Sequence, residues 1–162
     1  MIIKGLVDSD FQNYKKISMF ILFPCCSFKC NKDSGLKCCQ NEILFNSPNI
    51  EISIVEIVKR YRDNLLTQAI VCGGMEPFDS YDALFELITK FRSINCFDDI
   101  IIFSGYNREE ILPLIDSFKV FEGKGKIIVK FGRYIPNSNK KYDDILGVTL
   151  ASENQYAEVI VE

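Results

Sequence analysis

The stretch SMFILFPCCSFKCNKDSGLKCCQN, residues 18–41, joins a short apolar run to a loop that carries five of the chain's seven cysteines. The run at 18–23 has the length and composition of a buried β-strand. The cysteines follow it as a doublet, a single residue and a second doublet: Cys25, Cys26, Cys30, Cys38 and Cys39. A strand that ends in a dense group of thiols is therefore the most distinctive feature of the sequence.

Similar apolar runs recur along the chain and predict three more strands, largely buried on both faces. These runs are QAIVC (68–72), DDIIIFS (98–104) and KIIVKFG (126–132). Between them, apolar residues recur with helical spacing, first at Ile54, Val55, Val58, Tyr61 and Leu65, then at Leu84, Leu87, Ile88, Phe91 and Ile94. Asp79 or Ser80 is available to cap the second helix. A third helix is expected from Asn107, with a kink at Pro113.

Strands that alternate with helices predict an α/β fold with a mainly parallel sheet built from repeated βα units. Segments 2–7, 146–150 and 157–161 are expected to add strands at the edges of this sheet. A complete eight-fold barrel needs ~250 residues, so 162 residues can supply only part of a barrel or an open twisted sheet. No internal repeat or linker divides the sequence, which predicts one domain over residues 1–162.

An unusual segment follows each predicted strand. The cysteine-rich stretch follows the first, GGMEP (73–77) the second, SGY (104–106) the third and GRY (132–134) the fourth. In parallel α/β folds, the loops after the carboxyl ends of the strands lie on one face, where ligands bind. We therefore expect these four segments to meet at one site.

The overall composition excludes several classes of function. The net charge is −3 with a pI near 5.1, and no basic stripe is present, so a nucleic-acid partner is not expected. No run approaches the ~18 apolar residues that span a bilayer, and the N-terminus lacks a secretory signal. A cytoplasmic location is expected, where clustered cysteines bind metal or react more often than they form disulfides.

The spacing of the cysteines restricts what they could hold. No pair has the C-x-x-C spacing of a thioredoxin motif, and the chain contains no histidine. Adjacent residues in an extended chain point to opposite sides, so about three of the five thiolates could face one ligand. Three are too few for a four-cysteine zinc site, whereas three on a four-iron cluster leave one iron open. Spacing alone leaves Cys25 or Cys26, and Cys38 or Cys39, as alternatives.

Several motifs in order resemble those of the radical S-adenosylmethionine enzymes. They are Cys26-x3-Cys30, Cys39-Gln40-Asn41, GGMEP, FSGYNREE, FGRYI and LGVTLASENQ. More narrowly, the set is similar to the small activating proteins of anaerobic ribonucleotide reductases and covers most of the chain. The resemblance implies a partial TIM-like barrel.

The resemblance also implies the cofactors and the residues that hold them. It assigns Cys26, Cys30 and Cys39 to a [4Fe-4S] cluster whose open iron is chelated by S-adenosylmethionine. The residues implied to lie at the cofactor are Cys38, Cys39, Gln40, Gly73, Gly74, Met75 and Glu76. The usual spacing C-x3-C-x2-C would place the third ligand at Asp33, so we infer an expanded loop from Asn31 to Cys38. Met75 is a second departure, because it is inserted in a motif that is usually Gly-Gly-Glu/Asp-Pro.

In this family, a reduced cluster splits S-adenosylmethionine into methionine and a 5′-deoxyadenosyl radical. An activating protein uses that radical to remove hydrogen from a backbone glycine of anaerobic ribonucleoside-triphosphate reductase. The implied partners are the large subunit of that reductase and a flavodoxin- or ferredoxin-type electron donor. The alternatives are action on another glycyl-radical enzyme, a peptide or a small molecule, a degenerate member without catalysis, and a zinc-binding structural or interaction protein.

Some residues have simpler explanations. Packing explains Cys72 and Cys96, and core positions are expected for Phe20, Phe23, Phe91, Phe103 and Phe131. Arg133 is expected to be solvated or to meet a carboxylate or a partner.

Overall fold

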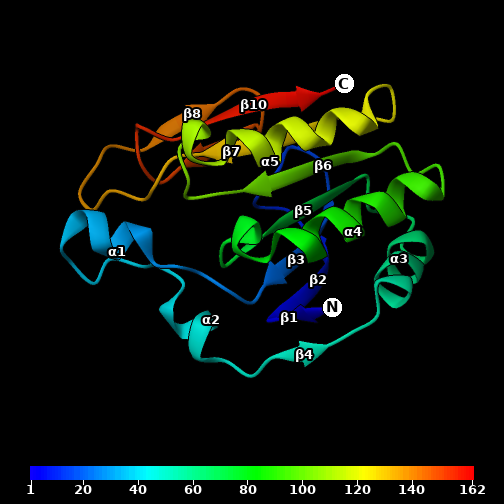
Figure 1. Ribbon diagram of the computed structural model, residues 1–162, viewed down its shortest axis with the longest axis horizontal. Coiled ribbons are helices and arrows are strands. Elements are labelled where there is room, and N and C mark those ends of the chain that lie inside the picture. The colour runs from blue at the N-terminus through cyan, green and yellow to red at the C-terminus, as the bar shows by residue number, and fades with distance from the viewer.

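The computed structural model describes residues 1–162 and shows a mixed sheet with helices on one side (Figure 1). The strands are β1 (Ile2–Ile3), β2 (Gly5–Asp10), β3 (Ser18–Phe23), β4 (Ile50–Glu51), β5 (Ala69–Gly74), β6 (Asp99–Phe103), β7 (Ile127–Phe131), β8 (Lys141–Asp143), β9 (Val148–Leu150) and β10 (Tyr156–Val161). The α-helices are α1 (Lys29–Ser34), α2 (Glu42–Asn46), α3 (Ile54–Asp63), α4 (Tyr81–Ser93) and α5 (Leu112–Ser117). Three 3₁₀ segments accompany them: η1 (Pro77–Ser80), η2 (Arg108–Ile111) and η3 (Phe118–Phe121).

The main sheet has six strands in the order β10-β7-β6-β5-β3-β2. The four strands predicted from the apolar runs form its centre and are parallel to one another. Both edges are antiparallel, with β10 on β7 and β2 on β3. The partial barrel stays a prediction, whereas the parallel centre brings the carboxyl ends of β3, β5, β6 and β7 to one edge of the sheet.

The larger core lies between the sheet and the helices α3, α4 and α5, with residues such as Phe23, Ile70 and Phe91 fully buried. The apolar face predicted for α4 is confirmed, because Leu84, Leu87, Ile88 and Phe91 are buried and Ile94 packs against the core. The face predicted for α3 is partly wrong. Val55 and Leu65 are 63% and 93% exposed, and Ile57 takes the buried place instead.

The third predicted helix has Asn107 as its N-cap, and it is divided into the 3₁₀ segment η2 and the helix α5. Asn107 and Glu110 form a reciprocal capping box that starts η2. Pro113 lies in the first turn of α5, where its missing N–H costs no helical hydrogen bond. The expected kink is therefore a change from a 3₁₀ turn to an α-helix. At α4, neither Asp79 nor Ser80 caps the helix through its side chain, because η1 leads directly into it.

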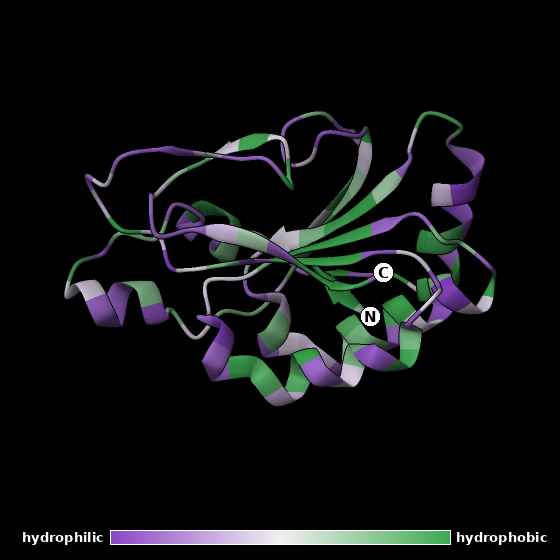
Figure 2. Cartoon of the chain, turned by 90° about the horizontal axis from the view of Figure 1, so that it is seen from above, coloured by the Kyte–Doolittle hydropathy of each residue, from purple (hydrophilic) through white to green (hydrophobic).

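A smaller core covers the opposite face of the sheet, where no long helix lies (Figure 2). Its residues from the strands, such as Val71 and Ile101, pack against Tyr14, Leu146 and Leu150. The expected edge strand over 146–150 is wrong, because β9 pairs with β8 in a separate hairpin. The expected strand over 2–7 is split, since β1 pairs with β4 and only β2 joins the main sheet.

Candidate functional site

A cavity of about 420 Å³ opens where the four parallel strands end. Its lining includes Cys26, Cys30, Cys39, Gln40, Asn41, Gly74, Met75, Glu76, Phe20, Phe103, Ser104, Gly105, Tyr106, Lys130, Gly132, Arg133, Tyr134 and Gln155. The cysteine loop, GGMEP, SGY and GRY all contribute, so the expected convergence of the four segments is confirmed. The volume falls in the range of small-molecule sites.

Three cysteines of the loop line this cavity, and two do not. Cys26, Cys30 and Cys39 contribute to its wall. Cys25 is exposed to solvent, and the Cys38 Sγ lies 3.3 Å from the Ser34 hydroxyl and 3.5 Å from the Cys30 carbonyl oxygen. One member of each doublet thus faces the cavity. Three thiols without histidine are the donor chemistry of an iron–sulfur cluster with one open iron.

The lining thiols sit in an environment that disfavours their charged form. Burial raises the pKa of Cys26 to about 11, and the carboxylates of Glu76 and Asp79 add to this shift. Burial is also the main cause that raises the pKa of Cys30, and the nearby Cys39 and Cys38 raise it further. No group of three or more Cys, Asp or Glu side chains is close enough to hold a single metal ion. Binding of iron here would release protons, because only thiolates bind it.

The GGMEP turn is shaped by a close approach of two backbones. Gly74 has φ of +79°, and a Cβ there would lie 3.0 Å from the Leu22 Cα. Only glycine satisfies both conditions without strain. Its carbonyl oxygen accepts a hydrogen bond from the Asn41 side chain at 2.6 Å, and the Glu76 N–H donates to the Cys25 carbonyl at 2.8 Å. These contacts tie the turn to both ends of the cysteine loop.

Two residues predicted at the cofactor have other surroundings. Gly73 does not line the cavity. It lies against Phe20 and Phe103, because a Cβ there would lie 3.0 Å from the Phe20 ring and 3.3 Å from the Phe103 Cβ. Cys38 does not line the cavity either. Phe20 and Phe103, expected in the core, are only partly buried and form an apolar part of the cavity wall instead. Both residues pack closely against Gly73, where a side chain would collide with them.

Glu76 and Lys130 hold the SGY turn from opposite sides. The Glu76 carboxylate accepts from the Ser104 hydroxyl at 2.9 Å and from the Gly105 N–H at 2.8 Å. The Lys130 Nζ donates to the carbonyl oxygens of Ser104 at 3.2 Å and Gly132 at 2.9 Å. Burial raises the pKa of Glu76 to about 7 and lowers the pKa of Lys130 to about 8.

Sequence reasoning missed Lys130 as a cavity residue. On β7, Ile127, Val129 and Phe131 face the helices, so the alternation of a strand places Ile128 and Lys130 on the other face. A single lysine in an otherwise apolar strand was the signal that could have found it. It is 7% exposed, and a buried ammonium is costly unless polar groups surround it.

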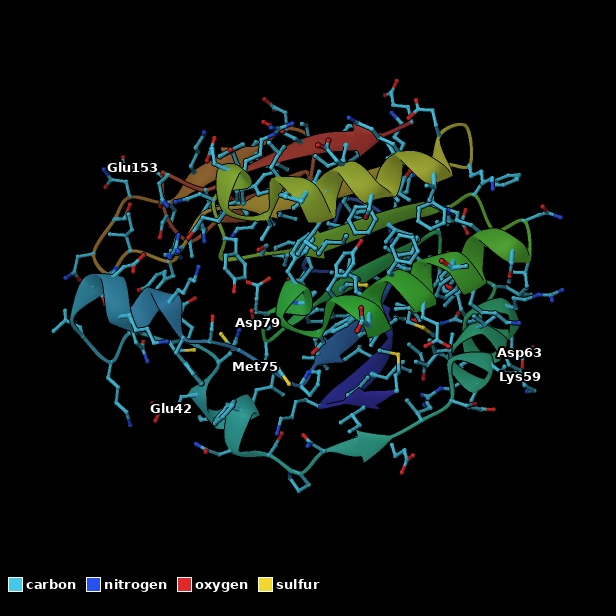
Figure 3. All side chains as sticks on the ribbon, in the orientation of Figure 1. Glu42, Lys59, Asp63, Met75, Asp79 and Glu153 are labelled. Atoms are coloured by element: carbon cyan, nitrogen blue, oxygen red, sulfur yellow. The ribbon has the colours of Figure 1, made fainter.

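A second polar network reaches the loop through Asp79. Its carboxylate accepts from the Ser27 N–H and from the Tyr106 hydroxyl, both at 2.5 Å. Burial and this hydrogen bond raise the pKa of Tyr106 to about 12. Met75 and Asp79 lie near each other beside the cysteine loop, whereas the Lys59–Asp63 pair is at the far end of the molecule (Figure 3).

Arg133 is not a solvated side chain, because it joins α1 to η2. Its guanidinium makes two 2.7 Å hydrogen bonds with the Glu110 carboxylate, and its Nε lies 2.7 Å from Asp33. The Nε–H is not aimed at Asp33, so that contact is an ion pair without a hydrogen bond. Lys29 adds a 3.1 Å ion pair to Glu110. Arg133 lowers the pKa of Glu110 to about 2.

Comparisons with known proteins agree with this chemistry. A family model described as a 4Fe-4S single cluster domain matches residues 15–145. The match spans the four parallel strands and every segment that carries a cavity-lining cysteine. No curated protein and no solved structure shows significant similarity to the chain. No helix of the chain is long and apolar enough to cross a membrane.

Proposed function

This chain belongs to the 4Fe-4S single cluster domain family, and from that premise we propose that it is a radical S-adenosylmethionine enzyme. The observation that carries the proposal is the placement of Cys26, Cys30 and Cys39 on one cavity with the turn at Gly74. The three thiolates would hold three irons of a [4Fe-4S] cluster. The fourth iron would face the rest of the cavity, where S-adenosylmethionine would bind. We also propose that the sheet is a partial barrel of the radical S-adenosylmethionine type.

When bound, such a cluster supplies the single electron that cleaves S-adenosylmethionine reductively. The chain's own residues bind and enclose the reactants. Gln40, Gly74, Met75 and Glu76 line the cavity on the cysteine side, and we assign them to the S-adenosylmethionine side of the site. The partly buried rings of Phe20 and Phe103 exclude water from the wall. Lys130 and Glu76 keep the SGY turn fixed, so the cavity keeps its shape.

The finer part of the proposal is that the enzyme generates a glycyl radical on anaerobic ribonucleoside-triphosphate reductase. It rests on the resemblance of the ordered motifs to activating proteins. A flavodoxin- or ferredoxin-type protein would supply the electron. Another glycyl-radical enzyme, or a peptide or small molecule, is the alternative substrate.

The first test combines metal content, spectroscopy and turnover. After anaerobic reconstitution we expect about four irons and four sulfides per chain. We also expect an electron paramagnetic resonance signal in the dithionite-reduced protein that changes with S-adenosylmethionine, and formation of 5′-deoxyadenosine. One tightly held zinc per chain and no cluster would overturn the proposal in favour of a structural zinc protein.

Serine substitutions test which thiols bind the cluster. Cys26→Ser, Cys30→Ser and Cys39→Ser should each lose most of the iron, because each removes a ligand. Cys25→Ser and Cys38→Ser are matched controls on the neighbouring residues, and they should retain iron as the native chain does. Loss of iron in a control with retention in its neighbour would show that the register is shifted by one residue.

Activation of the reductase is tested separately. Incubation of the reconstituted protein with the large subunit, reductant and S-adenosylmethionine should produce a glycyl-radical signal on the reductase. Cleavage of S-adenosylmethionine without such a signal would retain the enzyme class and reject this substrate.

A further inference from the structure

The segment between Cys30 and Cys39 folds back on itself. Residues 29–34 form α1, and the helix ends at Gly35, which has φ of +67°. A glycine in this left-handed conformation ends a helix and reverses the chain. The reversal brings Cys38 and Cys39 back beside the helix that contains Cys30, although they come eight and nine positions after Cys30 in the chain.

One side chain joins the two arms of this segment. The Asn31 Oδ1 accepts the backbone N–H of Cys38 and the backbone N–H of Cys39, both at 2.9 Å. An amide oxygen has two lone pairs, and the two N–H groups are its closest partners, with the Cys30 Sγ farther away at 4.0 Å. Ser34 bonds Leu36 and Cys38 locally, the Cys38 Sγ also lies 3.5 Å from the Cys30 carbonyl oxygen, and Lys37 pairs with Glu42 at the exposed surface.

Two successive N–H groups on one acceptor restrict the orientation of both residues. In the resulting arrangement Cys39 lines the cavity, while the Cys38 Sγ lies against Ser34 and the Cys30 carbonyl. Asp33, three residues after Cys30, instead pairs with Arg133 at 2.7 Å. The arm is thus held at α1 by Asn31, and α1 is held on the sheet by the ion pairs of Arg133.

We propose that Asn31 is a positioning residue that places Cys39, and not Cys38, as the third thiol of the cavity. The proposal rests on the proposed function for the role of that thiol, while the hydrogen bonds stand without it. The segment between Cys30 and Cys39 is long enough to place Cys39 away from the cavity. The Asn31 oxygen prevents this by holding the backbone of Cys38 and Cys39 next to the cavity.

The first experiment tests, in the full-length chain without a cluster, whether the Asn31 hydrogen bonds hold the segment that carries Cys38 and Cys39. Amide hydrogen exchange of residues 36–41 is compared between the native chain, Asn31→Leu and Asn31→Asp. Leucine has nearly the same shape but no acceptor, and loss of two hydrogen bonds should speed exchange of this segment about tenfold or more. Aspartate keeps the acceptor oxygens, so protection should be retained. Asn46→Leu, on the exposed helix α2, is the matched control and should leave 36–41 unchanged.

The second experiment measures the consequence for the thiols. After anaerobic reconstitution, the rate of iron loss to a chelator should be about tenfold higher in Asn31→Leu than in the native chain or Asn46→Leu. The reduced-cluster spectrum of Asn31→Leu should also broaden, because the third thiol is no longer held in one place. Cys38→Ser should retain iron in the native chain but should lower the iron content in the Asn31→Leu chain, because Cys38 can then replace Cys39 as the third thiol.

The outcomes separate this inference from the function on which it rests. Unchanged hydrogen exchange of residues 36–41 in Asn31→Leu would show that the Asn31 hydrogen bonds do not hold this segment. Faster exchange with an unchanged rate of iron loss overturns the positioning role of Asn31. A native chain that takes up no cluster overturns the proposed function, while the exchange measurement still decides whether Asn31 holds the arm.

Discussion

Gly74 has a backbone conformation that no other residue could adopt without strain. Its φ is +79°, and its Cα faces the backbone of Leu22 on the neighbouring strand. The residue stands at the end of β5, where the chain turns toward Glu76 and its carbonyl meets Asn41. The position of the cavity wall therefore depends on the absence of one side chain.

Gly74→Ala should be more destabilising than Gly123→Ala. Both glycines have φ near +75°, at +79° and +74°, but a Cβ at Gly123 would meet nothing within 4 Å. The left-handed conformation alone costs roughly 1–2 kcal/mol, and the contact with Leu22 should add about 1–3 kcal/mol at Gly74. Urea unfolding of both variants measures the difference, and equal free energies of unfolding would contradict the contact with Leu22.

At the scale of elements, the site depends on turns that are held by residues from neighbouring strands. The turn after β6 is fixed by Glu76 from the turn after β5 and by Lys130 from β7. The start of the cysteine loop is fixed by Asp79 from η1, which accepts from the Ser27 N–H. Each turn is thus ordered by charged groups from a neighbouring turn, 3₁₀ segment or strand.

The free energy of unfolding should depend on pH through Glu76. Its pKa is about 7 in the folded chain and 4.5 ordinarily, so the folded chain binds this proton more tightly than the unfolded chain. The contribution of this proton is fully present below pH 4.5, and it is lost as the pH rises through about 7. The loss should be on the order of 3 kcal/mol.

Urea unfolding from pH 4 to pH 8 measures this dependence. Glu76→Gln should remove the decrease across this window, because glutamine does not titrate. Glu153→Gln changes an exposed carboxylate, and it should keep the native profile. An identical slope in the native chain and in Glu76→Gln would show that Glu76 is not responsible.

At the scale of the whole molecule, both faces of the sheet are covered by different means. Helices cover one face, while the other is closed by Tyr14 and by the segment that carries Leu146 and Leu150. The cavity lies on this second face, because Phe20, Phe103 and Lys130 line it from the strands. The second core thus forms the base on which the site rests.

Leu146→Ala should destabilise the chain strongly, although Leu146 lies outside every long helix and every strand of the main sheet. The side chain is fully buried, and truncation of a buried leucine costs about 2–5 kcal/mol. Leu65→Ala is the matched control, since Leu65 is 93% exposed, and it should change stability by at most about 0.5 kcal/mol. Thermal and urea unfolding measure both, and a neutral Leu146→Ala would contradict the role of the second core.

Much of the architecture was predictable from local patterns. The four apolar runs became β3, β5, β6 and β7, and the helical spacing from Leu84 to Phe91 became the buried face of α4. The convergence of four segments at one site followed from the parallel order of the strands. These features depend on local patterns, because residues close together in the chain determine whether a segment forms a strand or a helix.

Other features depended on contacts between residues far apart in the chain. Val55 has helical spacing but lies outside the core, because the approach of α3 to the sheet decides which side of the helix is buried. Leu65 is exposed because α3 ends at Asp63, so the helical spacing no longer places it on the buried face. Lys130 has a strand environment in the sequence, yet its burial depends on Ser104 and the cavity.

The sequence by itself determined that three thiols of the cysteine-rich loop could share one ligand, since alternation separates the members of a doublet. Tertiary structure decided which members face the cavity: Cys26, Cys30 and Cys39 line it, while Cys25 is exposed and Cys38 lies against Ser34. The physical reason is that spacing limits how far apart two side chains can be, whereas their direction depends on the hydrogen bonds of Asn31 and Asp79.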